Sequence, residues 1–155
     1  MGISLRKATL KDAEKLWKMQ LESFKEMLMK YQDYDTNPGN EQIDRIIFKL
    51  KDPYTCFYFI CEDGKEAGAI RIVDYKDNNR KKRIAPLFIL PDYQNRGLAQ
   101  KAIELCEDIH GKYNWELDTS LQEKRNCHLY EKMGYHTIGK TRVINDKLTL
   151  ISYEK

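Results

Sequence analysis

One stretch, from Leu87 to Ala99, limits the fold of this chain more than any other. It reads LFILPDYQNRGLA: four apolar residues that favour a buried strand, Pro91 to end it, a polar turn, and Gly97 to open a helix. A helix start leaves backbone N–H groups unpaired and carries the positive end of the helix dipole, so it favours an anion. Small residues at Gly97 and Ala99 leave room for that anion. The stretch therefore predicts a strand–loop–helix site for a phosphate-bearing ligand, without identifying the ligand.

The spacing within this stretch separates it from other phosphate motifs. The chain contains neither G-x-x-x-x-G-K-[ST], which holds nucleoside triphosphates, nor G-x-G-x-x-G, which holds dinucleotides. The pattern Gln94-x-x-Gly97-x-Ala99 resembles the acetyl-CoA signature Q/R-x-x-G-x-G/A of the GNAT family of N-acetyltransferases. The resemblance implies that acetyl-CoA is the co-substrate. It also implies that the diphosphate of acetyl-CoA binds at Gln94, Asn95, Arg96, Gly97, Leu98 and Ala99.

A second segment, residues 123–133, is expected to form a helix that ends at Gly134. Asn126 and Tyr130 are four residues apart and therefore lie on one face of that helix. The run LYEKMGY, which contains Tyr130, resembles a later GNAT motif in which this tyrosine and an asparagine one turn earlier serve acetyl-CoA. The resemblance implies that Asn126 and Tyr130 bind the cofactor. A packing role is the alternative for Tyr130.

The remaining segments supply the elements of the same fold. The expected strands are residues 3–9, 54–62, 66–75, 84–90, 115–120, 137–144 and 147–153, and the expected helices are residues 12–31, 41–50, 97–110 and 123–133. Strand 115–120 follows a crossover helix, so it should run parallel to strand 84–90. This order matches the GNAT fold, which is of the α/β (α+β) class. We therefore expect a single domain, residues 1–155, with a mixed central sheet of about seven strands, four flanking helices and a splay between strands 84–90 and 115–120.

Composition excludes several classes of protein. With 155 residues, 41% of them hydrophobic and 33% charged, the chain can bury a sizeable core and keep a charged surface. The net charge of +3 suits an anionic ligand but is too small for a dedicated nucleic-acid binder. No apolar run is long enough to span a membrane or to act as a signal segment, so we expect a cytoplasmic protein.

The four cysteines are Cys56, Cys61, Cys106 and Cys127. They form no CxxC pair and lie at no metal-ligand spacing from a histidine, so we expect reduced thiols and no metal. His128 adjoins Cys127, but neighbouring residues on a helix point about 100° apart and do not form a catalytic dyad.

In the family that the chain resembles, the pantetheine arm of acetyl-CoA inserts between the strands equivalent to 84–90 and 115–120. Its amides can bond the free backbone edge of Leu87, Phe88 and Ile89, as an added strand would. The resemblance implies that this edge positions the thioester. One of its N–H groups would then stabilise the oxyanion that forms when an amine attacks.

The reaction also needs two proton transfers. Tyr130, a phenol with an ordinary pKa of about 10, suits a proton donor to the leaving thiolate. The attacking amine, with an ordinary pKa of about 10, must first lose a proton. Many family members place a Glu for this on the strand before the signature, but the strand here, IAPLFIL, has none. Glu116, Asp118, Glu123 or a water are the candidates for the base.

Two other functions stay open. One is a non-catalytic acetyl-CoA-binding or regulatory module with a GNAT fold, which the presence of both cofactor motifs disfavours. The other is an RNA-binding domain that uses the basic run KDNNRKKR, from Lys76 to Arg83, for which a patch that binds the 3′-phosphate of a cofactor is a further alternative. That run lacks the interleaved aromatic residues that stack on bases, so an exposed hairpin tip is the simpler interpretation.

The acceptor cannot be named from the residues. The resemblance places acceptor specificity in helices 12–31 and 41–50, the loop between them and the last hairpin. A small amine, an amino acid, an antibiotic and a protein N-terminus are all consistent with these segments, and a homodimer is an open alternative to a monomer.

Overall fold

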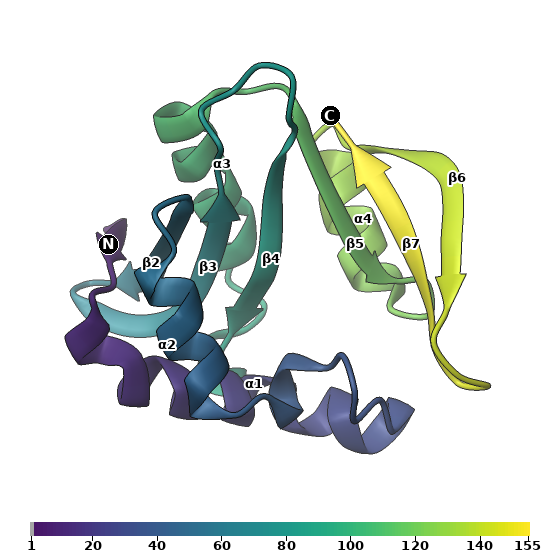
Figure 1. Ribbon diagram of the computed structural model, residues 1–155, viewed down its shortest axis with the longest axis horizontal. Coiled ribbons are helices and arrows are strands. Elements are labelled where there is room, and N and C mark those ends of the chain that lie inside the picture. The colour runs from purple at the N-terminus through teal and green to yellow at the C-terminus, as the bar shows by residue number, and fades with distance from the viewer. Residues whose placement is uncertain (1) are drawn as a thin grey trace.

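The computed structural model describes residues 2–155, which form a seven-stranded mixed sheet flanked by four α-helices (Figure 1). The strands follow the order β1-β2-β3-β4-β5-β7-β6 across the sheet. The strands are β1 (Ile3–Lys7), β2 (Thr55–Glu62), β3 (Lys65–Val73), β4 (Lys82–Ile89), β5 (Trp115–Ser120), β6 (His136–Val143) and β7 (Thr149–Glu154). The helices are α1 (Ala13–Tyr31), α2 (Ile43–Lys51), α3 (Leu98–His110) and α4 (Lys124–Lys132). The fold class and the element order predicted from the sequence are confirmed.

The first four strands form an antiparallel meander with register shifts in the β2–β3 and β3–β4 pairings, and the second of these lies near the site. Ile70 of β3 pairs with Leu87 of β4, but Ile72 pairs with Ile84, so β4 has one extra residue in this interval. Arg71 lies opposite the bulge, and its Nη1 donates to the carbonyl oxygen of Ala85 at 2.7 Å. The bulge bends β4 just before the segment that leads to the loop 91–97.

The parallel pairing of β4 and β5 is short. Lys82 pairs with Trp115 and Arg83 pairs with Glu116, and the backbone N–H of Lys82 donates to the carbonyl of Asn114 at 2.8 Å. Beyond Arg83 the two strands diverge, as Figure 1 shows for β4 and β5. The predicted parallel neighbours and the predicted splay are both confirmed, and the divergence leaves one edge of β4 open.

Each face of the sheet has its own hydrophobic core. α1 and α2 cover one face of β1 to β4, where Leu16, Ile46 and Phe59 are fully buried (Figure 1). α3 and α4 cover the other face, and the core beneath them continues across the splay from Ile70 to Leu117. This shared core holds β5 beside β4 although few backbone pairs join them.

The four helices pack against the two faces of the sheet. Along the described part of the chain, no helix combines the length and the apolar character that crossing a membrane requires.

Candidate active site

The open edge of β4 presents backbone groups from two of the three residues predicted to bind the cofactor. Leu90 N–H donates to the carbonyl of Ala67 in β3 at 2.8 Å. Backbone groups alternate in direction along a strand, so Phe88 also faces β3, whereas Leu87 and Ile89 face the open edge. The Phe88 side chain is buried and packs edge-on against Phe24, with ring centroids 5.7 Å apart. Phe88 therefore anchors the strand, and its neighbours direct their backbone groups to the open edge, where the Ile89 carbonyl accepts from Gln94.

The loop after β4 folds back onto the end of that strand. The Gln94 side chain donates from Nε2 to the carbonyl of Ile89 at 3.1 Å. Asn95 adopts the left-handed backbone conformation, with φ 66°, and its Oδ1 accepts from Arg125 of α4. Arg96 forms an ion pair with Glu62 at 2.6 Å. The polar residues of the motif thus set the path of the loop and bring two arginines to it.

Gly97 turns the loop into the start of α3. Its φ of 76° lies in the left-handed region, and no described atom stands within 4 Å of where a Cβ would be. Gly97 supplies no side-chain cap, and the first turn of α3 contains no acidic residue. The first backbone hydrogen bond of α3 runs from Lys101 N–H to the Gly97 carbonyl. The N–H groups of residues 98–100 therefore have no acceptor within the helix. Together with the buried anchor Leu98, this geometry makes a helix N-terminus that suits an anion.

The two residues predicted on α4 have different surroundings. Asn126 is half-buried, whereas Tyr130 is buried in the core, 5.9 Å from the ring of Tyr135 and 6.3 Å from that of Tyr153. Burial, with a further contribution from Cys127, raises the pKa of Tyr130 well above its ordinary value. The phenol therefore stays protonated throughout the physiological pH range.

Two of the three candidate bases are held in their ionised form. Asp118 Oδ1 accepts from Ser152 Oγ at 2.6 Å, and Oδ2 accepts from Arg83 at 2.7 Å. Burial opposes ionisation of Asp118, but these two hydrogen bonds outweigh it and lower its pKa. The hydroxyl of Tyr31 donates to Glu123, and this bond, together with Lys30 at 2.9 Å, lowers the pKa of that carboxyl. Carboxylates with lowered pKa values bind cations well but accept protons poorly.

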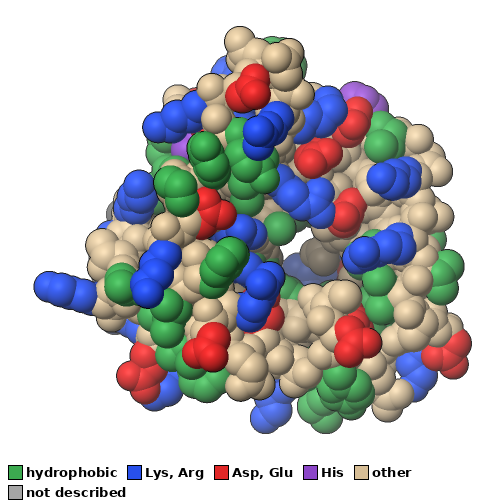
Figure 2. All heavy atoms as spheres, viewed as in Figure 1, with side chains coloured by type: hydrophobic (Ala, Val, Ile, Leu, Met, Phe, Trp, Pro, Cys, Tyr) green, Lys and Arg blue, Asp and Glu red, His purple; other side chains and the backbone are tan. Residues whose placement is uncertain are grey.

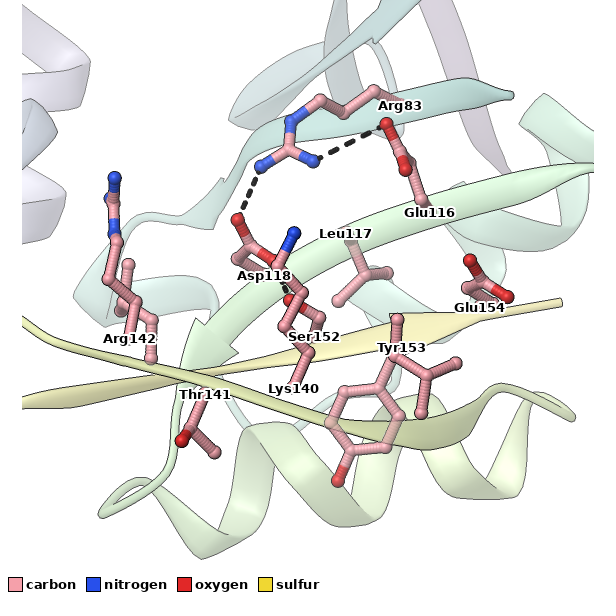
Figure 3. Close-up of a pocket in the computed structure, with 12 residues that line it drawn as sticks. Arg83, Glu116, Leu117, Asp118, Lys140, Thr141, Arg142, Ser152, Tyr153 and Glu154 are labelled. Atoms are coloured by element: carbon pink, nitrogen blue, oxygen red, sulfur yellow. Dashed lines mark hydrogen bonds and ion pairs between the residues drawn. The ribbon is translucent and has the colours of Figure 1, made fainter. Parts of the chain in front are cut away.

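The third candidate, Glu116, faces the same side of β5 as Asp118 and lies 3.7 Å from Arg83. Both carboxylates border a cavity of about 250 Å³ on the face of β5, β7 and β6 that α4 leaves uncovered (Figure 3). Its lining consists of Arg83, Glu116, Leu117, Asp118, Ile138, Lys140, Thr141, Arg142, Leu150, Ser152, Tyr153 and Glu154. Figure 2 shows this side of the molecule hollowed near its middle, with basic and acidic side chains around the hollow.

Sequence reasoning named Glu116 and Asp118 but missed Lys140, Arg142 and Ser152 as parts of this cavity. A signal for them exists in the residues, because charged and polar side chains alternate along the last two strands. The alternation predicts an uncovered face, but it does not say which other strand that face adjoins. The family resemblance implies that the last hairpin contributes to acceptor specificity, and residues of β6 and β7 do line this cavity.

The basic run at 76–83 makes several contacts within the chain. Lys82 Nζ donates to the carbonyl of Tyr113 at 2.9 Å, and Lys81 lies 3.8 Å from Glu154. The guanidinium of Arg80 lies 4.5 Å from the ring centre of Tyr75. These contacts tie the end of the hairpin to the base of the splay.

All four cysteines are free thiols. Among the described residues, no group of three or more His, Cys, Asp or Glu side chains is arranged to hold a metal ion.

Comparison with known proteins identifies the family. The profile of the Acetyltransferase (GNAT) family matches residues 13–135. The spermidine N(1)-acetyltransferase of Escherichia coli (strain K12) is 29% identical over 87 residues, which cover 53% of this chain and 46% of that relative. The chain thus spans about half the length of the curated relatives that it matches.

Solved structures share the fold over nearly the full chain. The PaiA N-acetyltransferase from Thermoplasma acidophilum in complex with coenzyme A has a TM-score of 0.70 and 17% identity, with 100% of both chains covered. The spermidine N-acetyltransferase from Vibrio cholerae in complex with CoA and spermine has a TM-score of 0.74 and 14% identity, with 97% of this chain and 93% of that chain covered. The profile match and the shared fold agree with the motif at Gln94, Gly97 and Ala99, and the chain belongs to the GNAT family of acetyltransferases.

Proposed function

We propose that this protein is an acetyl-CoA-dependent N-acetyltransferase that moves the acetyl group to a primary amine by direct attack in a ternary complex. The observation that carries the proposal is the end of β4–β5 pairing after Arg83. It leaves a free strand edge that leads directly to the uncapped start of α3. An amide-containing pantetheine arm fits the strand edge, and a diphosphate fits the helix start.

The chain's own groups divide the work of holding the cofactor. Leu87 and Ile89 offer backbone groups to the pantetheine amides, and Gln94 fixes the loop on which the diphosphate binds. Arg96 and Arg125 add positive charge near that loop. Asn126 lies on the helix that supplies Arg125.

The transfer forms the N–C bond, breaks the C–S bond and moves protons. The amine nitrogen attacks the thioester carbon, a backbone N–H of the β4 edge stabilises the oxyanion, and the C–S bond then breaks. The thiolate takes a proton from Tyr130, and the phenolate regains one, through solvent, from the substituted nitrogen, which loses its second proton as the amide forms. Because the pKa values of Asp118 and Glu123 are lowered and Glu116 is paired with Arg83 at 3.7 Å, we assign removal of the first proton of the amine to water.

The relatives support an amine acceptor, since the curated ones are named spermidine acetyltransferases and one solved relative was crystallised with CoA and spermine. A cytoplasmic location also stays a prediction, which the four free thiols favour. Whether the chain forms a homodimer stays a question for solution measurements.

The direct test is thiol release from acetyl-CoA in the presence of a panel of amines and peptides. We expect saturable acetyl-CoA binding, measured by calorimetry, together with thiol release that depends on the added amine. A protein that binds acetyl-CoA but releases no thiol with any acceptor would instead be a binding module. Absence of acetyl-CoA binding would contradict both functions.

A further inference from the structure

The cavity beside the splay contains charges that differ in how they are paired. Each of its three carboxylates has a basic partner: Asp118 and Glu116 lie 2.7 and 3.7 Å from Arg83, and Glu154 lies 3.8 Å from Lys81. Lys140 and Arg142 also line the cavity, yet neither has a carboxylate within 4.0 Å among the residues that the structure describes. The three carboxylates therefore each have an ion-pair partner, whereas Lys140 and Arg142 have none, although the charge of Arg142 helps to lower the pKa of Asp118.

The backbone of β6 explains how both free cations reach the cavity. Thr137 pairs with Tyr153 and Thr141 pairs with Ile151, so β6 has two extra residues between these pairs. Gly139, with φ 75°, lies within this irregularity and permits it. Figure 3 shows the Lys140 side chain reaching from β6 across β7 toward Asp118, and Arg142 lies on the same side of the sheet.

We propose that the acceptor is a primary amine that also carries a carboxylate, and that Lys140 and Arg142 bind this carboxylate. The proposal rests on the proposed acetyltransferase function and specifies its substrate class. Lys and Arg are the side chains that pair with carboxylates, and the guanidinium of Arg142 can do so with two parallel hydrogen bonds. Asp118, held ionised by Ser152 and Arg83, faces the same space.

The same charges disfavour a polyamine. The lining holds three basic side chains, Arg83, Lys140 and Arg142, and three carboxylates, Glu116, Asp118 and Glu154, each of which already has a basic partner. A polycation would meet the two free basic groups without a counter-charge of its own, and like charges in a partly enclosed site repel. The acceptor preference of this chain is thus expected to differ from the one in the names of its spermidine-specific relatives.

The test compares amines that differ only in a carboxylate. Suitable pairs are L-lysine with cadaverine, L-tyrosine with tyramine, and L-histidine with histamine, and spermidine serves as the polycationic reference. Thiol release gives kcat and KM, and saturation-transfer NMR gives binding of each amine to the complex with coenzyme A. An ethanolamine and phosphoethanolamine pair separates a carboxylate from a phosphate as the preferred anion.

We expect the carboxylate-bearing member to show a KM lower by about tenfold or more in at least one pair. Replacing both Lys140→Ala and Arg142→Ala should remove that preference while leaving the KM for acetyl-CoA unchanged. Lys65→Ala, an exposed lysine at the β2–β3 turn, is the matched control and should change neither constant. Thermal unfolding checks that each variant is folded.

Three results would overturn the proposal: equal or better use of every decarboxylated amine, a preference for spermidine, or a carboxylate preference that survives in the double variant. A preference confined to phosphoethanolamine would also overturn it in favour of a phosphate. If no amine releases thiol, the proposed function fails, and NMR binding of the same pairs to the wild type and double variant still decides the ligand class of the cavity.

Discussion

The two halves of the sheet, on either side of the splay, are built differently. In β2 and β3 the core extends over both faces, with Phe57 and Phe59 facing α1 and α2 and Ile70 and Ile72 facing the opposite layer. Strands β5 and β7 are covered on one face only, where Leu117 is 1% exposed, and every residue of β6 is exposed. The uncovered face of β5, β7 and β6 forms the charged cavity.

This difference is the basis on which we propose different ligands for the two halves. β4 can offer a ligand little except its backbone, because side chains such as Phe88 are committed to the core. The strands beyond the splay can offer charged side chains, because no helix covers their second face (Figure 1). A cofactor recognised through its amides and phosphates fits the first half, and an acceptor recognised through its charge fits the second.

The largest expected effect is on kcat, and it concerns Tyr130, which lies in the core shared by the two halves. Tyr130→Phe should lower kcat by about a hundredfold or more, because it removes the proton donor to the leaving thiolate. The KM for acetyl-CoA should change little, since the ring stays in place. Steady-state kinetics measures both constants.

The matched control is Tyr135→Phe, which removes a second buried hydroxyl whose ring centre lies 5.9 Å from that of Tyr130. If Tyr135→Phe and Tyr130→Phe lower kcat equally, or if neither lowers it, the acid role of Tyr130 is refuted.

The next prediction compares the stability contributions of the two faces of the sheet beyond the splay. Leu117→Ala should lower the free energy of unfolding by about 2–5 kcal/mol, because it leaves a cavity in the core shared by both halves. Ile138→Ala, on the charged side and 45% exposed, should change that free energy by about 0.5 kcal/mol or less. Urea denaturation measures both, and similar losses would contradict the one-sided burial.

A smaller effect separates the cofactor loop from an ordinary turn. Gly97 and Gly64 both have positive φ, 76° and 83°, and neither has a described atom within 4 Å of where a Cβ would be. Gly97→Val and Gly64→Val should therefore destabilise the fold similarly, by about 1–2 kcal/mol. Only Gly97→Val should also raise the dissociation constant of acetyl-CoA, by about tenfold, because its side chain stands where the phosphates approach.

Calorimetry with acetyl-CoA distinguishes the two glycine variants. Equal affinities in both would remove the start of α3 from the binding site.

The smallest effect concerns the ion pair that joins the two halves. The folded state lowers the pKa of Asp118, so this carboxylate adds stability above its ordinary pKa of about 3.9, and that contribution is lost as the pH falls through the lower folded value. Asp118→Asn should thus lower the free energy of unfolding by about 1 kcal/mol at about pH 6 and by much less at about pH 2. Urea denaturation at several pH values tests this, and a pH-independent difference would exclude the ion pair as its cause.

Much of the fold could be predicted because its signals are local. Strand 115–120 was predicted with the boundaries that the structure has, since apolar alternation and flanking turns define it. The path of the cofactor loop depends on Gln94, Asn95 and Gly97, all within one short segment. The orientation of Phe88 could not be predicted in this way, because it depends on contacts with two other elements. Its backbone faces β3 instead of the open edge, and its side chain faces α1.

The amino-acid sequence by itself indicated the order of elements and the family and predicted a site for a diphosphate, because each depends on spacing within a helix, a strand or a single loop. Only the tertiary structure decided which backbone edge stays open and which charges stay free. Those features depend on contacts between distant residues, such as Arg83 with Asp118, and on the absence of a described carboxylate within 4.0 Å of Lys140 or Arg142. Two charges pair only when the fold brings them close together, and the periodicity of residues along the chain does not specify that distance.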